Sequence, residues 1–595
     1  MDRTGIIVVS LCVVLLGIWF VEQNKVAMEQ ARYAATNRVA HLTVTNLAAL
    51  SNQLNAAVPP AGTPGPGFDT NQPESLLVTN YGRARYTFTS RGGGLKSVEL
   101  LDYPETISPR WKRKVATDGV ATLNMRAPLP VLAVLGDPGL FGDGNFTLGL
   151  RPDGVLAEKT LTNGLRLTKE FHLSSNYLVN TTVRLENPSE TPFPLPVQEW
   201  VIGTATPMGP DDNALSEGVM WFDGRGTQDR TVSWFSGTGF GCFRGTPRSE
   251  YVAGSNDVVW AAAHNQFFAL MAMPKDPAEQ IVARPVNLPP FPNVEPIPGA
   301  PPPQGVQTAF VYPAVTLAAH SALERHIVLF AGPKEYRLLA RIGDEFQNQA
   351  DLVMQFGKYL GFFAKALLLA MNWLHDVTRL GYGWVIVLIT VLIKVVFWPL
   401  TAASTRSMKR MQALAPEMQA LKEKYGDDMQ KLTQKQWELY RKHKVSPMSG
   451  CLPMAIQMPV FIGFFTMIRS AIELRGAHFL WIADLSKPDT IFMIPGINFP
   501  FNPLPLLMGG AMLWQSHLTP PSPGMDPAQA KIMRYMPLLF LVFLYNYSSG
   551  LALYWTVNNV LTIVQTKLTK MNQPAAGPAP QASGSALTPA SKRKK

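Results

Sequence analysis

The chain has 595 residues, of which 47% are hydrophobic and 16% charged, and its formal net charge is +11. This length predicts several domains, and the basic residues cluster beside apolar runs rather than among aromatic ones, which argues against a DNA or single-strand partner. Cys12, Cys242 and Cys451 are too far apart for a disulfide framework or a zinc site. We therefore expect no metal and no cofactor.

The N-terminal segment predicts a membrane anchor followed by a tether. Residues 6–21 are apolar and follow Arg3, without a small-residue cleavage site directly after them. We expect a retained transmembrane anchor over 1–22, with cleavage near Ala34 as the alternative. Residues 23–72 include an Ala/Pro/Gly-rich stretch that cannot bury a core and predict a flexible linker.

Residues 73–335 predict a large all-β domain of the sandwich type. Short alternating runs with Gly, Pro and Asn between them are typical of such domains. The expected strands lie at 84–89, 95–101, 258–263, 267–272 and 323–330, with a hairpin formed by 165–173 and 177–185 and a proline-rich loop at 285–303.

This β domain carries no recognisable catalytic motif. Its histidines are scattered on or beside strands, and neither an HExxH motif, a GxSxG motif nor a closely spaced carboxylate pair stands out. We expect a binding or scaffolding module with no catalytic residues, and not an enzyme.

Residues 336–381 predict a linker and a helix that lies in the membrane interface. The apolar run 359–377 is interrupted by Lys365, Asn372 and His375, which is typical of an interfacial amphipathic helix. The alternative, a true span, would invert the orientation of everything after it.

A second span is predicted over 382–403, and it carries one cation near its middle. About twenty apolar residues suffice to cross a bilayer core of roughly 30 Å. A lysine so deep is costly and normally faces a partner charge or a water-filled cavity. We expect Lys394 to face such a cavity; the alternative is a tilted helix that brings it to the interface.

Residues 404–446 predict a basic helical hairpin, with amphipathic helices over 404–425 and 429–443. Its excess of Lys and Arg places it in the cytoplasm by the positive-inside rule. The surface could contact anionic lipid or ribosomal RNA, or could be only a solvated charged face. The expected contact residues are Arg406, Lys409, Arg410, Lys422 and Lys424.

The remaining chain predicts four further spans, at 447–474, 503–518, 532–547 and 550–570. They are joined by a periplasmic loop at 475–502 and a cytoplasmic loop at 519–531, and followed by a disordered basic tail at 571–595. Counting spans outward from the hairpin puts the β domain in the periplasm and both termini in the cytoplasm, as in a multi-pass protein of a bacterial inner membrane.

Polar residues in these spans predict a hydrophilic cleft. Trp555, Asn558, Thr562 and Gln565 share one helix face. Polar side chains within spans prefer the bundle interior, where they either meet water or hydrogen-bond between helices. Together with Lys394, Thr390 and Gln457 they could line one groove; simple helix–helix contact is the alternative.

Several ordered blocks resemble the YidC family of bacterial membrane protein insertases, within the Oxa/Alb/YidC superfamily. They are GCLPMAIQMPVF at 450–461, PLT at 399–401, WIADLS at 481–486 and SGLALY at 549–554. The resemblance implies an α-helical polytopic membrane protein with an anchor, a five-helix core and a periplasmic β-supersandwich similar to sugar-epimerase folds. The cation at position 394 is usually arginine in the family, Trp555 stands where tyrosine is frequent, and Ser548 replaces a frequent proline.

The resemblance also implies a function: nascent membrane proteins move from the cytoplasm into the lipid bilayer through a groove open to lipid, with the Sec translocon and the ribosome as expected partners. The groove would be lined by Lys394, Thr390, Gln457, Trp555, Asn558 and Thr562, beside an apolar slide made of Met458, Phe461 and Phe543. A polytopic anion channel or small-solute transporter is the alternative. A membrane-anchored sugar-binding or epimerase-like enzyme is a third reading.

Overall fold

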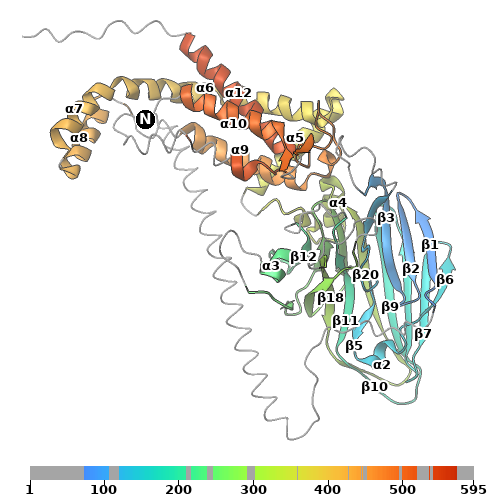
Figure 1. Cartoon of the computed structure of the whole chain (residues 1–595). Coiled ribbons are helices and arrows are strands. Elements are labelled where there is room, and N and C mark those ends of the chain that lie inside the picture. Colours follow the sequence, from blue (N-terminus) through green and yellow to red (C-terminus); the bar gives the residue numbers. More distant parts are fainter. Residues whose placement is uncertain are drawn as a thin grey trace, which may run out of the picture.

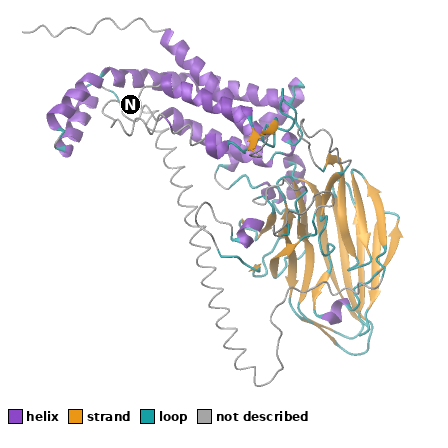
Figure 2. Cartoon of the chain, viewed as in Figure 1, coloured by secondary structure: helices purple, strands orange, loops and turns teal. Residues whose placement is uncertain are grey.

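The structure is a computed structural model that combines a β-sandwich domain with a bundle of long helices (Figures 1 and 2). It describes residues 73–105, 119–208, 216–237, 246–290, 302–357, 360–426, 428–443, 445, 452–494, 499–518, 535 and 541–571. The expected anchor, linker and C-terminal tail lie outside these residues, as does most of the expected span at 532–547.

A nine-stranded antiparallel sheet forms the larger layer of the β domain. Its strands, in spatial order, are β13 (Thr227–Thr231), β12 (Gly218–Phe222), β15 (Trp260–His264), β16 (Phe268–Pro274), β20 (Ser321–Pro333), β9 (Leu178–Asn187), β8 (Arg166–Leu173), β7 (Gly154–Thr160) and β6 (Thr147–Arg151). The last long strand in the chain, β20, pairs with β16 on one side and β9 on the other.

Two smaller antiparallel sheets pack against this layer and enclose the main core. One has the order β14 (Tyr251–Ala253), β17 (Gln280–Asn287), β18 (Gln304–Tyr312), β11 (Gln198–Ala205), β5 (Val134–Gly136); the other has β1 (Leu76–Tyr81), β2 (Ala84–Thr89), β3 (Gly94–Pro104), β4 (Val120–Leu123). The short elements α2 (Pro138–Phe141), α3 (Val232–Ser236), β10 (Phe193–Leu195) and β19 (Val315–Leu317) lie between them in sequence. The expected all-β sandwich is confirmed.

The expected hairpin is also confirmed, as β8 pairs with β9 from Arg166↔Glu186 to Leu173↔Val179. Side chains alternate between buried and more exposed along β8, because one face packs on the core and the other meets solvent. The turn between β2 and β3 depends on Gly93, whose φ is +55°; a Cβ there would lie 2.3 Å from the Phe146 ring.

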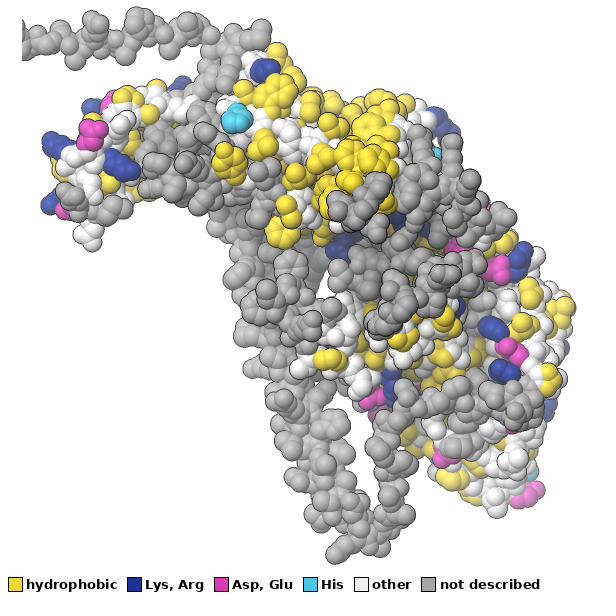
Figure 3. All heavy atoms as spheres, in the orientation of Figure 1, with side chains coloured by type: hydrophobic (Ala, Val, Ile, Leu, Met, Phe, Trp, Pro, Cys, Tyr) yellow, Lys and Arg dark blue, Asp and Glu magenta, His cyan; other side chains and the backbone are white. Residues whose placement is uncertain are grey.

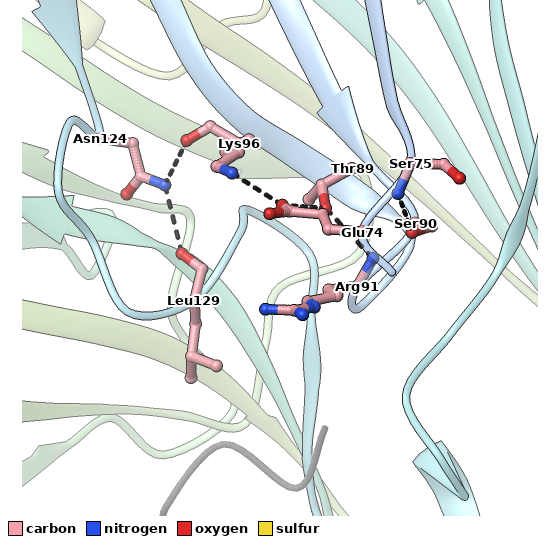
Figure 4. Close-up of polar contacts among 8 residues, drawn as sticks. All are labelled: Glu74, Ser75, Thr89, Ser90, Arg91, Lys96, Asn124 and Leu129. Carbon is pink, nitrogen blue, oxygen red and sulfur yellow. Dashed lines mark hydrogen bonds and ion pairs between the residues drawn. The ribbon is translucent and has the colours of Figure 1, made fainter. Parts of the chain in front are cut away.

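Polar contacts join the first strands to one another and to the segments beside them (Figure 4). Glu74 accepts hydrogen bonds from Thr89 Oγ1 at 2.6 Å and from Lys96 Nζ at 2.7 Å. Asn124 Nδ2 donates to the carbonyls of Lys96 and Leu129 at 3.0 and 3.2 Å. These bonds stabilise the four-stranded sheet and the segment that follows β4.

A second apolar core connects the β domain to the helices. In β15, Ala261 points into the sandwich while Trp260 and Ala262 point to the opposite face. That face is covered by α4 (Tyr336–Glu345), the 3₁₀ helix η2 (Ala350–Met354) and α5 (Gly361–Thr378). The indole of Trp260 donates to the Asn348 carbonyl at 2.9 Å, which ties the sheet to the segment between α4 and η2.

The same core continues into the helical part. Its longer elements are α6 (Tyr382–Ala413), α7 (Ala415–Tyr425), α8 (Met429–Lys442), α9 (Leu452–Ser470), α10 (Pro503–Leu518) and α12 (Ser549–Met571), with η4 (Ile472–Leu474), β21 (Phe492–Ile494) and β22 (Phe499–Phe501) between them.

One expectation differs from the structure. The helix predicted to begin at Ser404 is an unbroken continuation of α6, and the break falls at Leu414. Pro416 explains the break, since a proline is tolerated in the first turn of a helix but not in its interior.

Among the described residues, one helix, α6, is long and apolar enough to cross a membrane by length and composition. Large apolar side chains are exposed on the helical part, including Val396, Leu507, Trp514, Val542 and Val560. Figure 3 shows such side chains gathered over the helices, with basic ones at the α7–α8 end. An apolar surface of this kind needs a partner or a lipid environment.

Candidate functional site

Polar side chains of α6 and α12 meet along a line that we call the polar seam, formed by Lys394, Thr401, Asn558, Thr562 and Gln565. Lys394 Nζ donates a hydrogen bond to Thr562 Oγ1 at 2.8 Å. The Thr562 hydroxyl in turn donates to the Asn558 carbonyl at 2.7 Å, within its own helix. Position 394 on α6 therefore faces position 562 on α12.

Further along the seam, α6 contains Pro399 in its interior. Proline has no backbone N–H, so the carbonyl four residues earlier loses its usual donor and the helix is weakened there. Gln565 on α12 reaches this place, where its Nε2 donates to Thr401 Oγ1 and to the Trp398 carbonyl, the latter at 3.5 Å. The two helices are thus joined by polar contacts on both sides of the proline.

The ammonium of Lys394 has spare hydrogen-bonding capacity. It carries three N–H donors, and one of them is bonded to Thr562. Within the described part of the chain, no carboxylate lies within ion-pair distance of Lys394, which is partly exposed. A cation in apolar surroundings that is held by one hydroxyl attracts an anionic or strongly polar group.

Aromatic side chains connect the seam helix α12 to α9. The Trp555 ring meets the Phe461 ring edge-on at 4.4 Å between centroids. One residue earlier, Tyr554 stacks on Phe464 at 4.0 Å, and its hydroxyl is hydrogen-bonded by Gln457. These contacts place α9, α12 and α6 around one region.

The structure brings together some of the predicted site residues and separates others. Lys394 and Thr562 meet, Asn558 accepts the Thr562 hydroxyl with its backbone carbonyl, and Trp555 contacts Phe461. Thr390 is buried, and its hydroxyl donates to the Ile386 carbonyl of its own helix at 2.6 Å, which takes it out of the polar seam. Met458 is half-buried and Phe543 is 56% exposed.

The basic residues expected to make contacts lie on the α6 extension and on α7. Arg406, Arg410, Lys422 and Lys424 are exposed, while the side chain of Lys409 lies outside the description. Their exposure leaves them accessible to a partner.

Two polar residues of the helices were not assigned to the site from the sequence. Thr401 contacts Gln565 across the two helices; it belongs to the PLT block at 399–401, which was the available signal. Asn559 is buried, and its Nδ2 has no hydrogen-bond partner among the described residues. An unsatisfied buried amide in a span is costly, so this position is a further candidate for contact with water or substrate.

Two family models match the chain. The 60Kd inner membrane protein family matches residues 373–576, which include the polar seam, and the YidC periplasmic domain family matches residues 155–370. The apolar helical part is therefore that of an inner membrane protein, and the β domain is a periplasmic domain.

Individual relatives agree with these matches. The membrane protein insertase YidC of Syntrophus aciditrophicus is 30% identical over 512 residues, covering 84% of this chain and 85% of that one. That of Pseudomonas paraeruginosa is 42% identical over 257 residues, covering 43% of this chain and 41% of its own, so the alignment spans less than half of that relative. A solved active YidC insertase with its first transmembrane domain resolved covers 83% of this chain and 94% of its own at 19% identity; its TM-score of 0.32 is too low for a residue-level comparison.

The long alignment and the two consecutive family matches lead to one assignment. The chain belongs to the YidC membrane protein insertase family.

Proposed function

We propose that this protein inserts nascent membrane proteins from the cytoplasm into the inner membrane, through a hydrophilic groove built on the polar seam. Six spans, both termini in the cytoplasm and the basic α7–α8 hairpin on the same side make up the proposed arrangement. A polar segment of the substrate enters the groove from the cytoplasm while its apolar segment moves into lipid. No nucleotide is needed in this scheme.

The observation that carries the proposal is the partly satisfied ammonium of Lys394. Its contact with Thr562 leaves N–H donors for a substrate carboxylate. Hydration of the groove lowers the cost of taking a charged segment into the membrane. Transfer of the substrate's apolar surface into lipid then supplies about 25 cal/mol for each Å² removed from water.

The apolar slide of the proposal begins at the contact between Phe461 and Trp555, which lies beside the seam. Exposed Phe543 extends it toward lipid. A substrate helix that leaves the groove thus finds an apolar surface next to a polar one. This neighbourhood suits a chain segment that is polar at one end and hydrophobic at the other.

We also propose that α5 lies in the periplasmic interface rather than crossing the membrane. Its polar residues have protein partners: Lys365 Nζ pairs with Asp351 at 2.6 Å, and Asn372 Nδ2 donates to Glu473 at 2.7 Å. Its exposed large side chains are apolar, among them Phe362, Trp373 and Val377, while the exposed polar Asp376 lies in its last turn. A helix with one face on protein and one apolar face outward is suited to the headgroup region.

The Sec translocon and the ribosome are proposed as partners. The exposed cations on α6 and α7 form no ion pair with any described residue. The ion pairs of the hairpin involve other residues, for example Lys431 with Asp428. A basic surface at the cytoplasmic mouth suits the phosphate backbone of ribosomal RNA, and such contacts weaken as salt rises.

The test is protease protection of a single-span substrate added to liposomes with and without the purified full-length protein. We expect protection with the protein present, reduced by Lys394→Ala for substrates with acidic tails and restored by Lys394→Arg. Equal protection with and without correctly oriented protein would contradict autonomous insertion. Flux of a small anion through the same liposomes would instead support the channel or transporter.

A further inference from the structure

A small polar cavity lies where the β domain meets the end of α9. It measures about 50 Å³ and is lined by Ser216, Asn265, Gln266, Lys334, Gln355, Thr466, Arg469 and Ser470. A buried water needs roughly 10–15 Å³ of such space, so the cavity holds about four water-sized groups. That is comparable to the oxygens of one tetrahedral oxyanion.

The lining carries one lysine, one arginine and no carboxylate. Lys334 is 3% exposed and follows the central strand β20. Arg469 is exposed at the end of α9, and no carboxylate of the described residues pairs with it.

A chain of hydrogen bonds holds Lys334 in place. Its Nζ donates to His264 Nδ1 at 3.1 Å, and His264 Nε2 donates to Asp229 at 3.0 Å. The carboxylate is thus shielded from the ammonium by an imidazole. Burial lowers the pKa of Lys334 to about 7, and Asp229 offsets only part of this effect from a distance. Lys334 keeps N–H donors that no described residue accepts, and an anion beside them would favour its charged form.

The neutral lining groups add further donors. Asn265 Oδ1 accepts the backbone N–H groups of Phe267 and Phe268 at 3.1 and 2.9 Å, which fixes the amide and leaves its NH₂ group as a donor. Backbone carbonyls around the cavity are already occupied: Ser470 Oγ donates to Met354 O and Gln266 Nε2 to Arg469 O. The donors of Ser470 and Gln266 are thereby used, so the free donors are the remaining N–H groups of Lys334 and the Asn265 NH₂ group, which suit an acceptor-only ligand.

We propose that this cavity binds a phosphate-type oxyanion, held by Lys334, Arg469 and Asn265. Such a group is acceptor-only, tetrahedral and matched to a guanidinium–ammonium pair. The ligand is either the headgroup phosphate of a phospholipid or a soluble phosphate. A lipid headgroup is a candidate because α9 ends here, at the junction between the helices and the β domain. The site shares no residue with the polar seam and does not depend on the insertase proposal.

The test measures the melting temperature of the delipidated full-length protein in detergent. Three probes are titrated: inorganic phosphate, a short-chain phosphatidylglycerol, and the matching diacylglycerol that lacks the phosphate. We expect a saturable rise with one or both phosphate probes and none with the diacylglycerol. A response to the lipid alone identifies a headgroup site, and a response to inorganic phosphate alone identifies a soluble ligand.

Arg469→Gln should raise the probe concentration at the midpoint of this response by about tenfold or more. This is the size expected for a lost charge-assisted hydrogen bond. Arg341→Gln is the matched control, because Arg341 is an exposed arginine on neighbouring α4 that does not line the cavity. Lys334→Met tests the buried cation, and Arg469→Gln stands alone if that variant fails to fold. Absence of saturation with either phosphate probe, or an unchanged midpoint in Arg469→Gln, would overturn the site.

Discussion

The β domain and the helical part each enclose a lysine, and the two lysines are treated differently. Lys169 in β8 is fully buried and donates to the carbonyls of Gly92 and Leu132 at 2.6 and 2.7 Å. The Phe146 ring lies 4.6 Å from its Nζ. Lys394 on α6 is partly exposed and bonded to one hydroxyl. A satisfied lysine serves the fold, whereas a partly satisfied one is available to a substrate.

The largest expected effect comes from removing the satisfied lysine. Lys169→Met leaves two buried carbonyls without their donor, and each such group costs about 1–3 kcal/mol. At pH 9 we expect a loss of roughly 2–4 kcal/mol in the free energy of unfolding. Thermal unfolding of the full-length protein, followed by tryptophan fluorescence, measures it. An unchanged melting temperature would show that water replaces the ammonium.

The next largest effect concerns Lys394. Lys394→Ala should lower insertion of substrates with acidic tails by about tenfold, the value of one charge-assisted hydrogen bond, while unfolding changes little. Lys169→Met should lower the free energy of unfolding and leave insertion nearly unchanged, provided that insertion is measured below the melting temperature of this variant. Insertion rates and melting temperatures of both variants give the four values needed. If both variants lose insertion equally, the distinction between the two lysines is wrong.

The pH dependence of stability sharpens the comparison further. Burial, with Lys159 nearby, lowers the pKa of Lys169 to about 7 from 10.5. Between these values the unfolded chain binds a proton that the folded domain does not, so stability rises with pH by at most about 1.4 kcal/mol per unit. The unfolding free energy of the wild type should therefore gain on that of Lys169→Met from pH 7 to 10. Parallel pH profiles would contradict the buried, neutral lysine.

The smallest effect is expected at Thr562, the partner of Lys394. Thr562→Val keeps the shape but removes the hydroxyl that bonds both Lys394 and the Asn558 carbonyl. The lost contact with Lys394 is worth about 1 kcal/mol, or roughly fivefold in insertion rate. Thr562→Ser keeps the hydroxyl and is the matched control. A loss in both variants would point to packing of α6 against α12 rather than to the hydrogen bond.

Local patterns predicted much of the β domain and little of the contacts between distant residues. The hairpin β8–β9 was predictable because its strands have one face in the core and one toward solvent. The packing of β15 was not predictable, because both of its faces are buried, one in the sandwich and one against the helices. Continuous apolar runs of this kind do not reveal which side faces what.

The candidate site shows the same division. Lys394 was predictable because a cation in an apolar run is conspicuous, and the shared face of Asn558 and Thr562 follows from helical spacing. The contact between Gln565 and Thr401 joins residues 164 positions apart, and no local pattern encodes it. Lys334, His264 and Asp229 come from separate strands and from the segment after β20, so only the folded sheet brings them together.

The position of β20 governs the order in which this domain can form during synthesis. Because β20 lies between β16 and β9, the nine-stranded sheet cannot close until β20 has been synthesised, and one edge of β16 and one edge of β9 lack their neighbour until then. Open strand edges pair readily with other chains. The edges of β16 and β9 therefore need protection from other chains until β20 has paired with both of them.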